Sequence, residues 1–449
     1  MADAAAAQRW WAPRAWVQGR WRDAVLLEAA GDGTWARVVP DSARTSDAGA
    51  LPGPVLPGLV NAHSHAFQRA FVGLAEQRTN EHDDFWSWRD RMYGVALTLS
   101  PERLQQVATR LYRELLRGGY TQVCEFHYLH HADDGSRFAD PLAMSRALVL
   151  AAQDAGIGLT MLPVLYERAG FDSAGLRDDQ RRFATTVDDV FALRDDVRAL
   201  RAPHVSAGVA IHSLRAAKAS SILQLVERSS GDAAPIHIHV AEQTVEVDDC
   251  VAANGLRPIE WLSRHVVLDA RWQLVHATHT APAEVDAVAA SGAGVVLCPS
   301  TEANLGDGLP DLPRWLAGGT PLSIGSDSHV TRDWREELRL LEYGQRLAQR
   351  RRNVAAAPEH GVPSVAARLF ERALAGGAAA AGFTAWGLQA GARADLLMID
   401  TDDPALADRG PDHLLDTLVF SSPVRPFAGV MVAGRWVAGL GGSSERSRP

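Results

Sequence analysis

The chain has 449 residues, 47% of them hydrophobic and 22% charged, a composition that is ordinary for a folded globular protein with a large core. The formal net charge of −9 argues against nucleic acid or an anionic membrane as the main partner. Cys124, Cys250 and Cys298 lie far apart without a CxxC pair, so we expect buried thiols in a reducing, cytoplasmic setting rather than disulfides.

The two ends of the chain are both rich in β-strand patterns. Residues 10–56 contain short strand candidates such as "AWVQGRW", and the C-terminal stretches "ADLLMID" and "GVMVAGRWVAG" have the same character. We therefore predict that residues 1–57 and 386–449 together form one small β-sandwich domain. The N-terminal "MADAAAAQRWWAPRAW" lacks a continuous apolar core and a clear cleavage site, so no signal peptide is expected, and no apolar run suggests a membrane span.

The middle of the chain alternates between short apolar strands and amphipathic helices. The helix predicted at 100–119 has Ser100 as its N-cap, Pro101 at its first position and two glycines at its end. Strands are predicted just before His63 and at 121–126, 158–166, 206–212, 235–241, 272–278, 292–299 and 320–327. Eight repeated βα units predict an α/β fold, a (β/α)₈ TIM barrel over residues 58–385.

Polar residues follow the ends of these strands, and the carboxyl edge of a barrel is where active sites lie. In "PGLVNAHSHAFQRAF", His63 and His65 are two residues apart on a strand, so both rings point to one side. Taken alone, such a pair is more often two surface or capping histidines. The other strand ends weigh against that interpretation, because they carry Glu125, His127, His212, His239, His276 and Asp327. Imidazoles and a carboxylate on a shared edge predict a metal site suited to Zn²⁺.

The order of HxH, "HIHVAE", "VHATH" and "GSDS" resembles that of the amidohydrolase superfamily over nearly the whole chain. The stretches "GARADLLMID" and "GVMVAGRWV" are similar to the small β domain of its deaminase branch. The resemblance implies one Zn²⁺ or similar divalent ion per chain, held by His63, His65, His239 and Asp327, with the ion lowering the pKa of one bound water toward ~7.

The same resemblance assigns the catalytic work to three side chains. Glu242 takes a proton from the water and gives it to the departing nitrogen, His276 orients the attacking hydroxide, and Asp327 accepts a proton besides binding metal. His237 is expected beside the ligands and His279 at the surface. A two-metal site bridged by a carboxylated lysine is not expected, because Lys218 is the only lysine and lies in a helical stretch after the fourth strand.

The stretches "HAFQRAFVGLAE" and "DDFWSWRDRMY" are similar to those of N-formimino-L-glutamate deiminases, which act in histidine degradation. That resemblance marks five substrate-binding residues: Gln68, Arg89, Tyr128, His212 and Arg215. Two arginines suit a small-molecule substrate with two carboxylates, since each guanidinium can form paired hydrogen bonds with one carboxylate. The implied reaction is hydrolysis of N-formimino-L-glutamate to N-formyl-L-glutamate and ammonia. A homodimer is expected as well, although no residue pattern carries that expectation.

Three other functions stay open from the sequence. The first is a mononuclear-metal deaminase of a nucleobase or nucleoside, which needs donors for a base edge rather than two carboxylate clamps. The second is a hydrolase of a related carboxylated amidine or guanidine, which these residues do not separate from the deiminase. The third is an inactive barrel kept as a binding or scaffold protein, and the presence of Glu242 beside the full ligand set argues against it.

Overall fold

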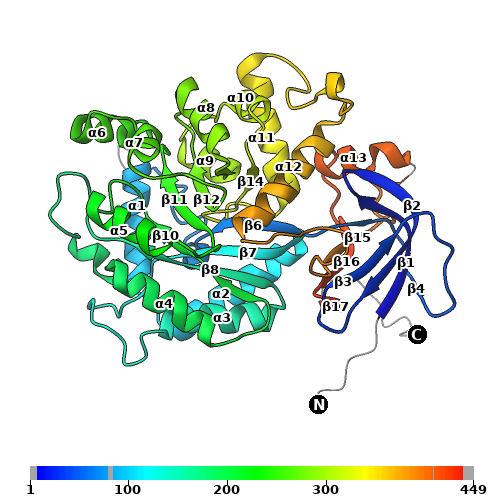
Figure 1. The fold of residues 1–449 in the computed structure, drawn as a ribbon, viewed down its shortest axis with the longest axis horizontal. Coiled ribbons are helices and arrows are strands. Elements are labelled where there is room, and N and C mark those ends of the chain that lie inside the picture. Colours follow the sequence, from blue (N-terminus) through cyan, green and yellow to red (C-terminus); the bar gives the residue numbers. More distant parts are fainter. Residues whose placement is uncertain (1–7, 79–83, 408, 438–449) are drawn as a thin grey trace.

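The computed structural model describes residues 8–78, 84–407 and 409–437 (Figure 1). Residues 1–7, on which part of the expectation about a signal peptide rests, lie outside the described residues. Among the described residues, no helix is both long enough and apolar enough to cross a membrane.

A nearly closed parallel barrel forms the larger part of the structure, as predicted. Within the described residues its eight strands follow one another in chain order: β6 (Leu59–Ser64), β7 (Tyr120–His127), β8 (Gly158–Leu165), β10 (Val209–Ile211), β11 (Ile236–Val240), β12 (Trp272–His276), β13 (Gly294–Leu297) and β14 (Leu322–Ile324). A short strand, β9 (Val205–Ala207), pairs with β8. The fourth predicted strand is thus divided at Gly208, where a Cβ would come within 2.4 Å of the carbonyl oxygen of Pro235.

The first and last barrel strands meet beside the predicted metal ligands. An isolated parallel bridge joins Ser64 to Asp327. The backbone N–H of Asp327 donates to the carbonyl oxygen of His63 at 3.0 Å, and that of His65 donates to the carbonyl oxygen of Asp327 at 3.3 Å. Barrel closure therefore brings together side chains that are more than 260 residues apart in sequence.

Helices cover the outside of the barrel (Figure 1). They are α2 (Pro101–Arg117), α3 (Ala143–Ala155), α4 (Val187–Ala199), α5 (Ala219–Arg228), α6 (Thr244–Asn254), α7 (Pro258–His265), α8 (Pro282–Ser291), α9 (Pro299–Leu305), α10 (Leu312–Ala317), α11 (Trp334–Gln349) and α12 (Val365–Ala380). In α2, Ser100 accepts a hydrogen bond from the backbone N–H of Arg103 and Pro101 occupies the first turn, as predicted. Its apolar stripe is buried and includes Leu104, Leu111 and Leu115.

The helix α12 packs directly against β6 and β14, two of the three strands whose ends supply the ligands of the predicted metal site. A Cβ at Gly376 would lie 2.0 Å from the carbonyl oxygen of Leu322 in β14, and a Cβ at Gly377 would lie 2.9 Å from the Cβ of Val60 in β6. Only glycine permits this approach. The small-residue run "ALAGGAAAAGF" therefore forms a closely packed helix, as predicted.

A separate, mainly antiparallel sheet is built from both chain ends, as predicted. Its strands are β1 (Gln8–Val17), β2 (Arg20–Ala29), β3 (Trp35–Val39), β4 (Gly49–Ala50), β5 (Val55–Leu56), β15 (Leu396–Ile399), β16 (Phe427–Val432) and β17 (Arg435–Trp436). The short strand β5 joins the two ends, because it pairs with β1 on one side and β15 on the other. The C-terminal part also holds a helix that was not predicted, α13 (Leu414–Phe420). The domain boundaries after residues 57 and 385 stay predictions.

Candidate active site

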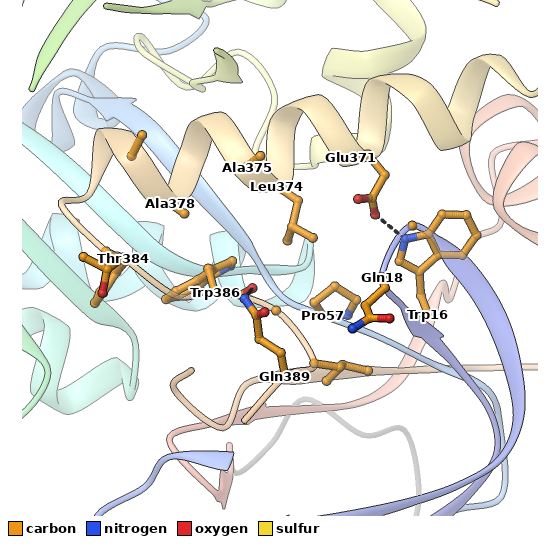
Figure 2. Close-up of a pocket in the computed structure, with 15 residues that line it drawn as sticks. Trp16, Gln18, Pro57, Glu371, Leu374, Ala375, Ala378, Thr384, Trp386 and Gln389 are labelled. Carbon is orange, nitrogen blue, oxygen red and sulfur yellow. Dashed lines mark hydrogen bonds between the residues drawn. The ribbon is translucent and has the colours of Figure 1, made fainter. Parts of the chain in front are cut away.

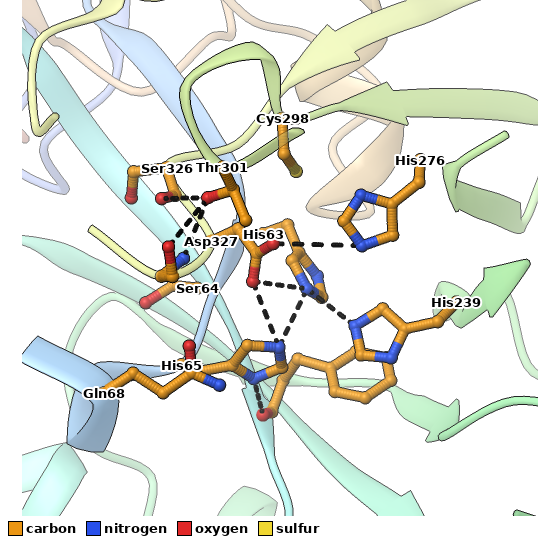
Figure 3. A network of polar contacts seen from close by, with 12 residues as sticks. His63, Ser64, His65, Gln68, His239, His276, Cys298, Thr301, Ser326 and Asp327 are labelled. Atoms are coloured by element: carbon orange, nitrogen blue, oxygen red, sulfur yellow. Dashed lines mark hydrogen bonds and ion pairs between the residues drawn. The ribbon is translucent and has the colours of Figure 1, made fainter. Parts of the chain in front are cut away.

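Four predicted ligands converge at the carboxyl edge of the barrel (Figure 3). The Nε2 atom of His63 lies 3.1 Å from that of His65 and 2.9 Å from that of His239. One carboxylate oxygen of Asp327 lies 3.6 Å from His63 Nε2 and 3.3 Å from His65 Nε2. All four side chains are buried. The three histidines thus form a group that could hold a metal ion, with Asp327 adjacent to it.

The histidines of this group are held in the form that binds metals. Burial and the neighbouring histidines lower the pKa of His63 and His239 well below the usual range. Burial lowers the pKa of His65 to about 3. The Nδ1 of His65 lies 2.9 Å from the carbonyl oxygen of Phe126, which can only accept a hydrogen bond. His65 Nδ1 therefore carries the proton, and the Nε2 lone pair points into the group. This donor set, three nitrogens and one carboxylate, fits a divalent ion such as Zn²⁺.

His276 lies close to three carboxylates, those of Glu242, Glu302 and Asp327. Its Nε2 is 3.6 Å from Glu242 and 3.8 Å from Asp327, and its Nδ1 is 3.6 Å from Glu302. Burial opposes the charged imidazolium, but these three carboxylates outweigh it and raise the pKa of His276 to about 10. The pKa of Asp327 is raised to about 7 because burial and the charges of Glu242 and Glu302 outweigh the attraction of His276. The titrations of His276 and Asp327 are therefore coupled to each other.

A second group that could hold a metal ion shares a member with the first. It consists of His276, Cys298 and Asp327. Cys298 is buried, and burial together with the nearby carboxylates raises the pKa of its thiol well above the usual range. Because Asp327 belongs to this group and also contacts the three-histidine group, the two are parts of one site rather than two separate sites.

A cavity opens beside the metal-ligand group. Its lining includes His65, Gln68, Phe85, Trp88, Arg89, Met92, Tyr93, Tyr128, His212, Arg215, His239, Glu242, His276, Leu305 and Asp327. All five predicted substrate-binding residues and all three predicted catalytic residues are in this set. Several aromatic residues come from the helix α1 (Phe85–Ala96), which the stretch "FWSWRDRMY" forms.

The two arginines in the cavity have few protein partners. Arg215 is buried and has no ion pair within 4 Å among the described residues; burial opposes its charged form, but the charges of Glu246 and Glu242 outweigh burial and raise its pKa. The buried Nε of Arg89 has no hydrogen-bond partner among those residues, and its ion pair with Asp90 is long, at 3.6 Å. Both guanidiniums lie over the indole of Trp86, with Arg89 4.5 Å and Arg215 5.3 Å from its ring centre. A shared aromatic ring thus supports two positive charges in a water-poor cavity.

Gln68 and His212, two polar residues that line the cavity, each contact a hydroxyl group of a neighbouring side chain. The side-chain amide of Gln68 donates to the hydroxyl of Tyr128 at 3.0 Å, while its buried Oε1 has no partner among the described residues. The Nδ1 of His212 lies 3.1 Å from the hydroxyl of Ser213, and its ring packs 4.2 Å from that of Tyr166. Gln68 therefore presents a free acceptor to any ligand that enters.

Other polar residues singled out in the sequence point elsewhere. Glu125 turns away from the cavity and accepts hydrogen bonds from Ser64 and from the backbone of Ala66. His237 contacts the carbonyl oxygen of Ala380 at 2.8 Å rather than a metal ligand. His279, expected at the surface, is half-buried, and its Nε2 lies 2.7 Å from the carbonyl oxygen of Asp307. Lys218 is exposed before α5 and does not line the cavity.

His127 also belongs to the predicted strand ends and lies outside this cavity. Its ring packs against that of His130, with 4.7 Å between ring centres. Its Nε2 is buried and has no hydrogen-bond partner among the described residues, and burial lowers its pKa to about 3. His127 is therefore part of the packing behind the second strand rather than of the metal-ligand group.

The sequence matches the amidohydrolase family over residues 55–437. The chain belongs to the amidohydrolase family. It is 48% identical over 439 residues to a formimidoylglutamate deiminase from Pseudomonas aeruginosa, covering 97% of this chain and 96% of that protein. It is 30% identical over 363 residues to a 5-methylthioadenosine/S-adenosylhomocysteine deaminase from Natronomonas pharaonis, covering 80% of this chain and 75% of that protein.

A solved structure supports the same family. An amidohydrolase from Brucella melitensis superimposes with a TM-score of 0.90 at 40% sequence identity, covering 96% of this chain and 94% of that one. The barrel and the small sheet of both chain ends are therefore the fold of a known amidohydrolase.

Sequence reasoning missed several side chains of this amidohydrolase site. Glu302 contacts His276 and lies in α9 directly after β13, a strand whose end carried no predicted site residue. Tyr93 lines the cavity, and its hydroxyl lies 3.1 Å from that of Tyr166. Tyr93 lies in the quoted segment "FWSWRDRMY", so the signal was there, but its role depends on where α1 packs.

A larger cavity does not belong to the site (Figure 2). It lies between α12 and the small sheet, away from the metal-ligand group. Its lining includes one carboxylate, Glu371, which accepts a hydrogen bond from the indole of Trp16. Cavity size alone therefore does not locate the reaction centre in this amidohydrolase, whereas the convergence of ligands does.

Proposed function

We propose that this amidohydrolase hydrolyses N-formimino-L-glutamate to N-formyl-L-glutamate and ammonia, a step of histidine degradation. The observation that carries the proposal is the pair Arg89 and Arg215, two cavity arginines with little or no carboxylate pairing of their own beside a metal-ligand group. A dianionic substrate supplies the missing partners, since an unpaired buried charge is costly. The 48% identity to a formimidoylglutamate deiminase over nearly the whole chain supports the same substrate.

In the proposed enzyme, His63, His65, His239 and Asp327 hold one Zn²⁺ or similar ion. When bound, a divalent ion lowers the pKa of water at the site toward ~7. The remaining steps belong to the side chains around it. Glu242 takes a proton from the attacking water, and the oxygen bonds to the planar formimino carbon.

Collapse of the tetrahedral intermediate releases the leaving group. Glu242 or Asp327 gives a proton to the terminal nitrogen, the bond between carbon and that nitrogen breaks, and ammonia departs, while the other carboxylate takes the hydroxyl proton as the formyl C=O forms. His276 lies 3.6 Å from Glu242 and 3.8 Å from Asp327, so it can orient the water relative to both carboxylates. The unpaired Oε1 of Gln68 is placed to accept a hydrogen bond from the formimino group.

The alternative functions fit the cavity less well. A nucleobase deaminase is supported by the 30% identical 5-methylthioadenosine/S-adenosylhomocysteine deaminase, but two cavity arginines, of which only Arg89 has an ion pair and a long one, do not match a neutral base. A related carboxylated amidine or guanidine fits the same arginines and is separated only by assay. An inactive scaffold has no use for Glu242 beside a complete ligand set. The expected cytoplasmic location and homodimer stay predictions.

The deciding experiment measures ammonia release by the zinc-loaded protein. N-formimino-L-glutamate should be turned over far faster than cytosine, guanine or adenosine, because only the first substrate pairs with both arginines. Faster release from any of the bases would contradict the proposed substrate. Release from a carboxylated guanidine at an equal rate would widen the substrate class without changing the site.

The ion content provides a separate prediction. Purified protein should hold about one zinc-like ion per chain, because three histidines and one aspartate complete a single tetrahedral set with water. Removal of the ion by a chelator should abolish ammonia release, and added Zn²⁺ should restore it. Two tightly bound ions per chain, measured by elemental analysis, would contradict the mononuclear site.

A further inference from the structure

A continuous set of buried hydrogen bonds lies behind the metal-ligand group. We call it the bracing network, and its members are Asn61, Ser64, Glu125, Ser326 and His329, all of them buried. Ser64 separates His63 from His65, and Ser326 directly precedes Asp327. The network therefore connects the two chain segments that supply three of the four proposed ligands.

The hydrogen bonds of the network run in one consistent direction. Ser64 donates to a carboxylate oxygen of Glu125 at 2.7 Å, so its oxygen is free to accept from the Nε2 of His329, 3.4 Å away. The Nδ1 of His329 then accepts from Ser326 at 2.9 Å, and Ser326 accepts from the side-chain amide of Asn61 at 2.7 Å. A neutral imidazole offers one donor and one acceptor, which is what this position requires.

Each end of the network is fixed to the backbone. The side-chain oxygen of Asn61 accepts from the backbone N–H of Ser326 at 2.8 Å. Glu125 accepts from the backbone N–H of Ala66 at 2.6 Å and from the hydroxyl of Tyr112 at 3.2 Å. The hydroxyl of Ser64 and the backbone N–H of Ala66, on the two sides of His65, are thus tied to one carboxylate. Thr301 adds a further contact, because its hydroxyl accepts from the backbone N–H of Ser328 at 3.2 Å.

The segment that contains Asp327 and His329 has strained backbone that needs support. Asp327 and His329 have φ angles of +45° and +68°, in the left-handed region that non-glycine residues rarely adopt. Such conformations persist when surrounding contacts determine them. The hydrogen bonds of Ser326 and His329 lie on either side of Asp327 and supply those contacts.

We propose that the bracing network is a positioning device, which holds His63, His65 and Asp327 at the spacing that binds metal and thereby sets the zinc affinity of the site. The inference rests on the metal site of the proposed function, but it does not depend on the substrate. None of the network residues is itself a proposed ligand. Outer partners of metal ligands change metal affinity by about 10- to 100-fold when they are removed.

The test measures zinc affinity rather than turnover. Ser64→Ala and Ser326→Ala each break the network, on the first and on the eighth strand respectively. Competition with a chelator of known affinity should show zinc binding weakened by about 10- to 100-fold in each variant. The double variant should bind zinc only slightly more weakly than either single variant, because both changes disconnect His329.

A matched control separates positioning from general packing. Ser229 is also buried, and its hydroxyl donates to the carbonyl oxygen of Leu225 at 2.9 Å, remote from the ligands. Ser229→Ala loses one buried hydroxyl in the same way and should keep wild-type zinc affinity. Thermal unfolding of the metal-free proteins compares the folded states directly. If one serine variant fails to fold, the other tests the network from the opposite strand.

The outcomes distinguish this inference from the proposed function. Wild-type zinc affinity in both Ser64→Ala and Ser326→Ala would overturn the bracing network alone. Equal weakening in Ser229→Ala would overturn it too, since the effect would then be one of general stability. A wild-type protein that binds no zinc would overturn the proposed metal site. A protein that binds zinc but releases no ammonia from N-formimino-L-glutamate would overturn the proposed substrate and leave the network standing.

Discussion

Replacing Glu242 with glutamine should lower kcat by roughly 10²- to 10⁴-fold on N-formimino-L-glutamate, the range typical of a lost general acid–base group. Glutamine keeps the size of the side chain but cannot take a proton from water or return it to the leaving nitrogen. Glu242 lines the cavity 3.6 Å from His276 and is not one of the four proposed ligands. Ion content should therefore stay at the wild-type level in the same preparation.

A buried carboxylate away from the cavity provides the control for this prediction. Glu342 is buried in α11, accepts from the backbone N–H groups of Val354 and Ala355 at 2.8 and 3.0 Å, and does not line the cavity. Glu342→Gln keeps an oxygen that can accept one of these bonds, so most of the wild-type kcat should remain. A fully active Glu242→Gln enzyme would remove Glu242 from the mechanism, and loss of zinc in that variant would reassign it to the metal site.

The convergence of the metal ligands could be predicted because it depends on regular structure. His63 and His65 share a strand face by the period of two, and a parallel barrel places all strand ends on one edge. The shared edge needed only local sequence and the count of strands, whereas the choice of His63, His65, His239 and Asp327 as ligands came from the resemblance to the amidohydrolase superfamily. Histidines outside that regularity were harder to place. His279, expected at the surface, is half-buried because the chain after β12 folds against Asp307.

The surroundings of the ligands could not be predicted in the same way. The bracing network requires barrel closure, since Asn61 and Ser326 touch only when the first and eighth strands meet. Short polar side chains such as these have no periodic pattern that marks them. The raised pKa of His276 likewise depends on three carboxylates from segments that follow different strands. One of them, Glu302, belongs to the helix after the seventh strand.

Replacing Arg215 with alanine should lower kcat/KM on N-formimino-L-glutamate by roughly 10- to 100-fold. A hydrogen bond to a charged group is worth about 1.5–3 kcal/mol, and about 1.4 kcal/mol corresponds to a tenfold change. The loss should be larger if the substrate carboxylate is left buried without a partner. The same range is expected for Arg89→Ala, while zinc content should be unchanged in both variants because neither arginine is a ligand.

The prediction depends on the planar shape of the guanidinium and on its position in the cavity. Lysine at either position should restore little activity, because a point charge does not replace a planar fork that pairs with both carboxylate oxygens and stacks on Trp86. Arg228 is the matched control, since it stacks 4.3 Å from the ring centre of Phe191 and pairs with Asp188 on the outer surface. Arg228→Ala should keep wild-type kcat/KM. If Arg89→Ala and Arg215→Ala also keep it, the two arginines do not bind carboxylates, and a neutral substrate such as a nucleobase fits the cavity better.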